Sequence, residues 1–334
     1  MSNKIISITS ALIFGGGVVF ADVPKVAVDI APAHSLVAIV MNGIGKPDLI
    51  IPVEASPHAY QLRPSEAKAI QQADLVFWLG EDLTPWLGKA LSTLAERTSV
   101  TTLLEVNGIE LLEFREGALF EAHEHDEHDE RDEHDEHDEH DEHDEHDEHD
   151  EHDEHDEHDE HDEHDKYDPH AWLSPSNAKV WLNVIAAKLS EIDPGNAGTY
   201  FTNADLARQN LDELSKEINQ ILDPIRDKKF VVFHDAYQYF EKDFNISASG
   251  AISLADSSDP SPARLKEIRN RVVEESVQCV LAEPQYNKGL VTAVVEGTGS
   301  NTAIIDPLGV GLEAGPFLYE KLIRKLAVNL SKCF

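Results

Sequence analysis

The sequence predicts an α/β fold of two lobes, each a mostly parallel sheet flanked by helices, joined by one long rigid helix. Two observations lead to this prediction. Short apolar runs alternate with helical patterns both before and after the middle of the chain, as in consecutive βαβ units. Between the alternating halves, a polar stretch carries apolar residues at helical spacing with no internal Pro. Because parallel strands place ligands at their carboxyl ends, we expect a binding site in the cleft between the lobes.

The first half of the chain supplies the N-terminal lobe, assigned to residues 22–194. Pro64 begins one helix, where its missing N–H costs nothing, and Ser174 with Pro175 begins another. We expect strands over residues 25–28, 48–53, 75–79 and 99–103, and helices over 32–41, 64–73, 85–94 and 174–189.

The linking helix is predicted from Asn196 to Leu222, where Asp223 and Pro224 stop it. Its length is about 40 Å, enough to run along one lobe and reach the next, and we assign residues 195–227 to it. The C-terminal lobe, residues 228–334, repeats the alternation. Its strands are expected over residues 230–233, 246–251, 277–282 and 302–305, with a closing helix over 317–330.

Residues 1–21 have the pattern of a secretory signal peptide. Lys4 supplies the positive end, residues 5–20 the apolar core, and Val19-Phe20-Ala21 a cleavage site after Ala21. The alternative, a membrane anchor, needs a longer apolar stretch, and no later segment is long and apolar enough. We therefore expect a soluble, exported protein, located in the periplasm of a bacterium with an outer membrane.

Cys279 and Cys333 are the only two cysteines. In an exported protein, a lone pair more often forms a disulfide than stays free, and the CxxC spacing of a metal site is absent. We expect a bridge that pins the C-terminal helix to a strand of the second sheet.

A charged repeat interrupts the first lobe over residues 121–165. It holds 29 Asp and Glu, one Arg and 14 His, a net charge of −28, so −9 of the total of −37 remains for the rest of the chain. Such a segment cannot offset its ordering entropy and should be disordered. With no basic patch to oppose phosphate, nucleic-acid binding is excluded.

The repeat allows two interpretations. An acidic run alone is a solvated linker, but imidazole at every third position is a ligand for first-row metals, and neighbouring carboxylates attract cations. We therefore predict an auxiliary, low-affinity metal-binding segment. Its histidines are His123, His125, His128, His134, His137, His140, His143, His146, His149, His152, His155, His158, His161 and His164.

The ordered histidines lie where a cleft is expected. His58 and His234 follow predicted strands, and His170 precedes a predicted helix, while Glu283 and Asp306 each follow a strand directly. Each alone is ordinary, because a loop His is usually a surface residue and an Asp after a strand usually caps a helix. Their joint placement is what predicts a site.

Three neutral imidazoles with a weak or open fourth position are typical of zinc. Manganese prefers more oxygen ligands and copper(I) prefers sulfur, and Met1 and Met41 are the only methionines. His34, near the start of the first helix, is assigned a helix-end role, with support of a metal ligand as the lesser alternative.

Four motifs of the sequence carry a resemblance to a known family. They are SPHAYQLRPS at 56–65, DPHAWLSP at 168–175, VFHDAY at 232–237 and AEPQY at 282–286. In this order they resemble the zinc-specific metal-binding proteins of periplasmic ABC uptake systems, over the whole mature chain. The resemblance implies zinc held between two lobes by His58, His170 and His234, and a disulfide between the two cysteines. It also implies delivery to a membrane permease with its cytoplasmic ATPase.

The chain departs from the family in one place. Relatives of this type can have a Glu directly before the first zinc His, whereas Pro57 stands there and cannot ligate. Asp306, which matches a ligand position of the manganese branch, a water, or a His of the repeat could take the fourth position, and we rank water and Asp306 first.

The function predicted from the sequence is zinc capture and delivery by a monomeric carrier, not catalysis, with the repeat gathering or sensing zinc. Periplasmic zinc chaperones are further candidate partners. The alternatives are a carrier for manganese or another divalent metal, a periplasmic metal buffer, and a zinc hydrolase. The hydrolase needs a general base, for which Glu283 is the candidate, and HExxH is absent.

Overall fold

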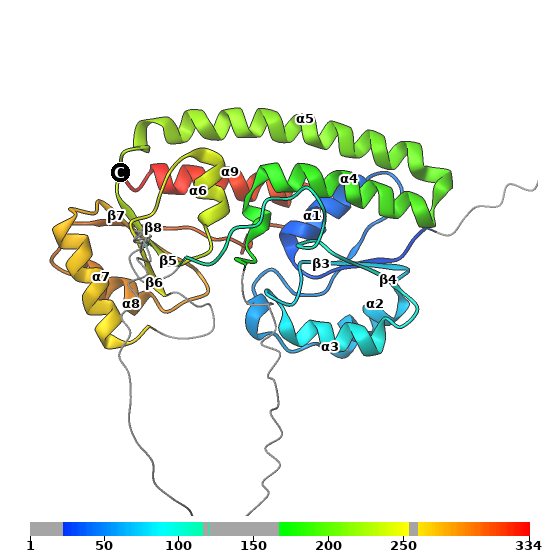
Figure 1. Ribbon diagram of the computed structural model, residues 1–334, viewed down its shortest axis with the longest axis horizontal. Helices are drawn as coiled ribbons and strands as arrows, with labels where there is room; N and C mark the ends of the chain where they lie inside the picture. Colours follow the sequence, from blue (N-terminus) through cyan, green and yellow to red (C-terminus); the bar gives the residue numbers. More distant parts are fainter. Residues whose placement is uncertain (1–22, 116–119, 121–166, 254–259) are drawn as a thin grey trace, which may run out of the picture.

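A computed structural model describes residues 23–115, 120, 167–253 and 260–334 (Figure 1). The predicted signal peptide and the charged repeat both lie outside the described residues. The rest forms two lobes side by side, with one long helix running across both of them (Figure 1).

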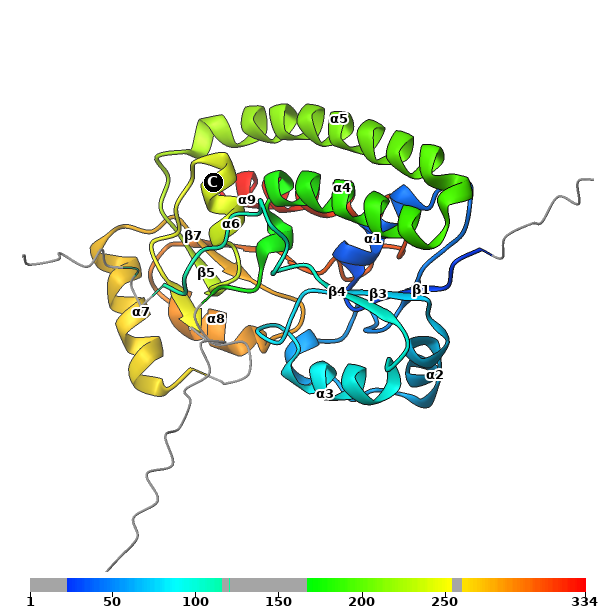
Figure 2. The ribbon, with the colours of Figure 1, turned by 45° about the vertical axis from the view of Figure 1, so that its right-hand side comes forward.

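The first sheet consists of four parallel strands in the order β2-β1-β3-β4. Helices α2 and α3 cover one side of it and α1 and α4 the other (Figures 1 and 2). The strands are β1 (Val26–Val28), β2 (Asp48–Leu49), β3 (Leu75–Trp78) and β4 (Ser99–Thr102), and the helices are α1 (Ala31–Val40), α2 (Pro64–Gln72), α3 (Pro85–Leu94) and α4 (Pro175–Ile192).

The second sheet repeats this order as β6-β5-β7-β8, again parallel throughout. Its strands are β5 (Phe230–His234), β6 (Ala251–Ser253), β7 (Cys279–Ala282) and β8 (Asn301–Ile304), and its helices are α6 (Gln238–Phe244), α7 (Pro262–Glu274), α8 (Lys288–Val295) and α9 (Leu318–Ser331). The predicted α/β class with two parallel sheets is confirmed.

One predicted strand was wrong. The segment 246–251 was expected to be a strand, but β6 begins only at Ala251. Helix α6 ends at Asn245 in the left-handed conformation (φ 51°). The residues after it form a connection that reaches the sheet edge, where the Ser249 N–H donates to Phe230 O. Ile246 is buried under that connection, so its apolar character reflects burial and not strand pairing.

Helix α5 (Ala197–Leu222) confirms the predicted long helix, and it ends where Pro224 was expected to end it. Helix α9 lies beside α5 and also packs on α1 of the other lobe. There the Tyr319 N–H donates to Ser35 Oγ (3.0 Å), and one hydrophobic core extends through both lobes. Helix α9 therefore adds a second set of contacts between the lobes, beside the predicted long helix.

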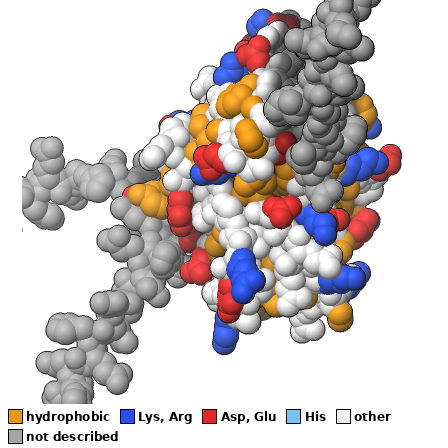
Figure 3. Space-filling view, turned by 90° about the vertical axis from the view of Figure 1, so that its right-hand side faces the viewer, with side chains coloured by type: hydrophobic (Ala, Val, Ile, Leu, Met, Phe, Trp, Pro, Cys, Tyr) orange, Lys and Arg blue, Asp and Glu red, His pale blue; other side chains and the backbone are white. Residues whose placement is uncertain are grey.

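The Cys279–Cys333 disulfide is present. It joins β7 to Cys333, which lies two residues after the end of α9. No helix in the described residues is long and apolar enough to cross a membrane. Acidic and basic side chains are both scattered over the face in Figure 3, in keeping with a net charge concentrated in the repeat.

Candidate metal centre

The three predicted histidines come from three separate segments of the chain. His234 is the last residue of β5. His58 lies in the short 3-10 helix Pro57–Ala59, and His170 is the residue before the 3-10 helix Ala171–Leu173. These segments belong to both lobes, so the site lies between them.

The imidazole rings lie close together. The ring centres are 5.8 Å apart for His58 and His170 and 5.3 Å apart for His170 and His234. An ion about 2.1 Å from one nitrogen of each ring, at tetrahedral angles, would separate the ring centres by roughly 5 Å. All three rings line one cavity of about 20 Å³, which is room for a single ion or water.

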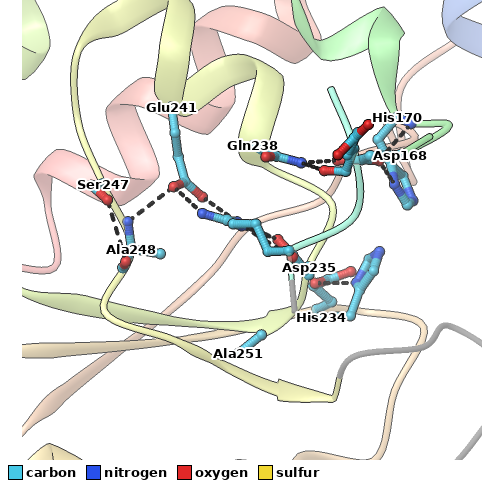
Figure 4. Close-up of polar contacts among 12 residues, drawn as sticks. Asp168, His170, His234, Asp235, Gln238, Glu241, Ser247, Ala248 and Ala251 are labelled. Carbon is cyan, nitrogen blue, oxygen red and sulfur yellow. Dashed lines mark hydrogen bonds and ion pairs between the residues drawn. The ribbon is translucent and has the colours of Figure 1, made fainter. Parts of the chain in front are cut away.

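Two of these imidazoles are fixed by buried carboxylates. His170 Nδ1 lies 2.7 Å from Asp168 Oδ1, and His234 Nδ1 lies 2.7 Å from Glu283 Oε1 (Figure 4 shows both rings). A carboxylate only accepts hydrogen bonds, so Nδ1 carries the proton in each ring and Nε2 is the nitrogen suited to a metal. This carboxylate–histidine arrangement orients the ring and raises its basicity as a ligand.

His58 is held differently. It is half-buried, whereas His170 is only 3 % exposed and His234 only 4 %. The turn around it is held by Trp86 of α3, whose Nε1–H donates to Pro57 O (2.8 Å). Nearby, the Tyr60 hydroxyl donates to Glu66 Oε1 (2.7 Å).

The three rings meet without forming a complete set of metal ligands. Within the described parts of the chain, no group of three or more His, Cys, Asp and Glu side chains is arranged so that it could hold a metal ion as it stands. Of the three histidines, only His58 is half-buried.

Asp306, the predicted fourth ligand, lies beside the cavity without lining it. Its Oδ1 accepts hydrogen bonds from Gln285 Nε2 and Leu308 N–H, both 3.0 Å. Its Oδ2 is buried and accepts no hydrogen bond from the described residues. Pro57 lines the cavity but has no donor atom for a metal.

The surroundings of the cavity favour a cation. Burial raises the pKa of Tyr237 well above its ordinary value, and the charges of Glu283 and Asp306 raise it further. The phenol therefore stays neutral, and the negative charge near the rings comes from the carboxylates.

His34 lies in α1, apart from this cavity, with Nε2 3.0 Å from Pro47 O in the loop before β2. The fourteen histidines of the repeat lie outside the described residues. The chain on either side of the repeat is described, and Glu113 and Tyr167 pair there as an antiparallel bridge.

Sequence reasoning missed the roles of Asp168 and Trp86. Asp168 stands two residues before His170, a spacing that lets one carboxylate accept from both the backbone N–H and the ring of that His, so the sequence did carry a signal. Nothing local pointed to Trp86, because its contact joins α3 to a turn 29 residues earlier.

Comparisons with known proteins give relatives that cover most of the chain. Residues 26–333 match the family described as "Zinc-uptake complex component A periplasmic", ZnuA. The High-affinity zinc uptake system protein ZnuA of Brucella abortus (strain 2308) is 46 % identical over 308 residues, 92 % of this chain and 91 % of the relative. That of Paracoccus denitrificans (strain Pd 1222) is 44 % identical over 314 residues, 94 % of this chain and 92 % of the relative.

Solved structures share the fold. A crystal structure of ZnuA superposes with a TM-score of 0.70 at 22 % identity, covering 93 % of this chain and 99 % of the other.

Proposed function

The chain belongs to the ZnuA family of periplasmic zinc-uptake components, and on that premise we propose that it captures one zinc ion between its lobes and hands it to a membrane importer. The family consists of solute-binding proteins and not enzymes. The observation that carries the proposal is the meeting of the His58, His170 and His234 rings, from distant parts of the sequence, around one ion-sized cavity.

Three nitrogen donors support zinc over manganese, which favours oxygen. The fourth position goes to a water or to Asp306, whose buried Oδ2 has no hydrogen-bond donor among the described residues. A manganese carrier is the alternative, and an oxygen-rich ligand set would favour it. The hydrolase alternative is disfavoured, because its candidate general base, Glu283, is hydrogen-bonded to His234.

The importer would consist of a permease and a cytoplasmic ATPase, with the carrier acting as an exported monomer cleaved after Ala21. Periplasmic zinc chaperones are possible further partners. The repeat would gather or sense zinc close to the site. Its composition supports this role, and so does the position of the Glu113–Tyr167 bridge, because Tyr167 is only three residues before His170.

Zinc titration against a competing chelator tests both parts of the proposal. The intact chain should bind one ion tightly and several weakly. A variant lacking residues 121–165 should keep the tight site and lose the weak ones, whereas His234→Ala should do the reverse. Tight binding that survives His234→Ala would refute the cleft site, and tight binding lost with the repeat would refute this division of labour.

A further inference from the structure

The two buried histidines are connected by a second set of contacts, which joins the lobes on the side of the metal cavity. Residues 110–115 and 167–168, on either side of the repeat, lie against α6 of the second lobe. The Leu112 N–H donates to the Tyr239 hydroxyl (3.0 Å), and that hydroxyl donates to Asp168 O (2.7 Å). This strip of the N-terminal lobe is thus bonded directly to the helix that follows His234.

Arg115 makes the strongest of these contacts. Its Nε donates to both carboxylate oxygens of Asp235, each at 3.0 Å, and its two terminal nitrogens donate to Glu241 at 2.8 and 3.1 Å. The Arg115 side chain is 17 % exposed, and the two acidic side chains are 4 % and 5 % exposed. Such forked, charge-assisted bonds fix position as well as adding energy.

The clasp, defined as Arg115, Asp235 and Glu241, adjoins one metal ligand directly and the other through residues of α6. Asp235 directly follows His234 in the chain. On the other side, Asp168 binds the His170 ring through Oδ1 and accepts from Gln238 Nε2 (3.2 Å) through Oδ2 (Figure 4). The segment from His234 into α6 therefore contacts residues that hold both histidines.

We propose that Arg115 is a positioning residue for zinc, which sets the distance between His170 and His234 without touching the metal. The inference rests on the proposed function. A site must hold its ligands to within about 0.5 Å, and the 5.3 Å spacing of these two rings spans the junction between the lobes. Without the clasp, we expect the bonds from Tyr239 and Gln238 to Asp168 to fix that spacing less tightly.

The molecule offers a matched control on the far side of the lobe junction. Arg324 of α9 forms a two-bond pair with Glu217 of α5, at 2.8 and 2.9 Å, in which the side chains are 39 % and 44 % exposed. It also joins two elements through an arginine fork, but it involves no residue of the metal cavity.

The first experiment compares Arg115→Lys with Arg324→Lys in the full-length protein. Lysine keeps the charge and loses the fork. Tight zinc affinity, measured by chelator competition, should fall about 10–100-fold for Arg115→Lys, the range for residues that support a metal ligand, and stay within about twofold for Arg324→Lys. The visible spectrum of bound Co²⁺, which reports ligand geometry, should change only for Arg115→Lys.

A second variant tests the same idea without leaving unpaired buried charges that could unfold the protein. Arg115→Met leaves two buried carboxylates unpaired, which is strongly destabilising, so it is combined with Asp235→Asn and Glu241→Gln to remove the unpaired charge. The triple variant should melt cooperatively without metal and still bind zinc weakly with the altered Co²⁺ spectrum.

The proposal is overturned if Arg115→Lys keeps both the affinity and the spectrum, or if Arg324→Lys weakens zinc equally. His234→Ala, measured in parallel, keeps this result separate from the proposed function. If His234→Ala loses tight zinc while Arg115→Lys binds normally, the cleft site stands and only the positioning role of Arg115 fails.

Discussion

The two flanks of the metal cavity are built in opposite ways. On one flank, His170 and His234 are buried, each ring is fixed by a carboxylate, and the lobes are bonded together beside them. On the other flank, His58 is half-buried in a three-residue 3-10 helix, and its turn is held from within its own lobe.

This difference gives the two flanks different roles: one contributes affinity for zinc, and the other lets zinc enter and leave the site. A ligand pair that is oriented before the metal arrives loses little conformational freedom on binding, so it contributes most of the affinity. A half-buried ligand costs more to order, but its side chain can move without disturbing the core. We call the side with His170 and His234 the closed flank and the side with His58 the open flank. We expect zinc to bind first to His170 and His234, and His58 to complete the site.

The connections between the lobes favour this view over a hinged closure. Helices α5 and α9 both run across the junction, and the strip beside the repeat bonds to α6 on the opposite side. We therefore expect metal binding to need only a small closing motion, with the adjustment concentrated in side chains.

Acid should have the largest effect, because it acts on both flanks at once. A protonated imidazole cannot bind zinc, so affinity should fall as the pH drops through about 6.5, the ordinary imidazole pKa. Each imidazole that must lose a proton adds up to about tenfold per pH unit. Chelator competition between pH 7.5 and 5.5 measures the slope for the intact chain and for His58→Ala. The zinc affinity of the intact chain should depend on pH more steeply than that of His58→Ala, by one proton. Equal slopes would show that His58 is not a ligand.

Glu283→Gln should have the next largest effect, on the closed flank alone. The amide keeps the shape but loses the charge that orients and activates His234, so zinc affinity should fall about 10–100-fold. Glu191→Gln is the control, because Glu191 lies in an exposed ion pair with Lys188 at the end of α4. Should both variants bind zinc equally well, the carboxylate beside His234 has no part in setting affinity.

The fold could be predicted from the sequence largely because its signals are local. Pro64, Pro85 and Pro175 each stand at the first position of a helix, and buried parallel strands appear as short apolar runs. The strand at 246–251 was misplaced for the same reason, since a buried connection is as apolar as a strand.

The site was predictable only as far as it depends on position along the chain. The approach of the His58, His170 and His234 rings was expected because His58 and His234 follow predicted strands, and parallel strands gather ligands at their carboxyl ends. The contacts of Arg115 could not be found, since they join residues 120 and 126 positions apart, and a separation of that size leaves no periodic trace in a single sequence. The fourth ligand stays a prediction, because Asp306 lies beside the cavity and not on it.

Trp86→Phe should have the smallest effect, confined to the open flank. The change keeps an aromatic ring and removes the N–H that donates to Pro57 O, a bond worth about 0.5–1.5 kcal/mol net. Because that bond holds the turn of His58, zinc affinity should fall by about tenfold at most, with faster release measured by transfer to a chelator. Trp181→Phe is a close control, since its Nε1–H donates to Leu103 O (2.9 Å) within the core of the same lobe. It should lower the melting temperature of the metal-free protein and leave zinc release unchanged. If Trp86→Phe reduced affinity as much as Glu283→Gln, the open flank would be as preset as the closed one, and the distinction between affinity and access would not hold.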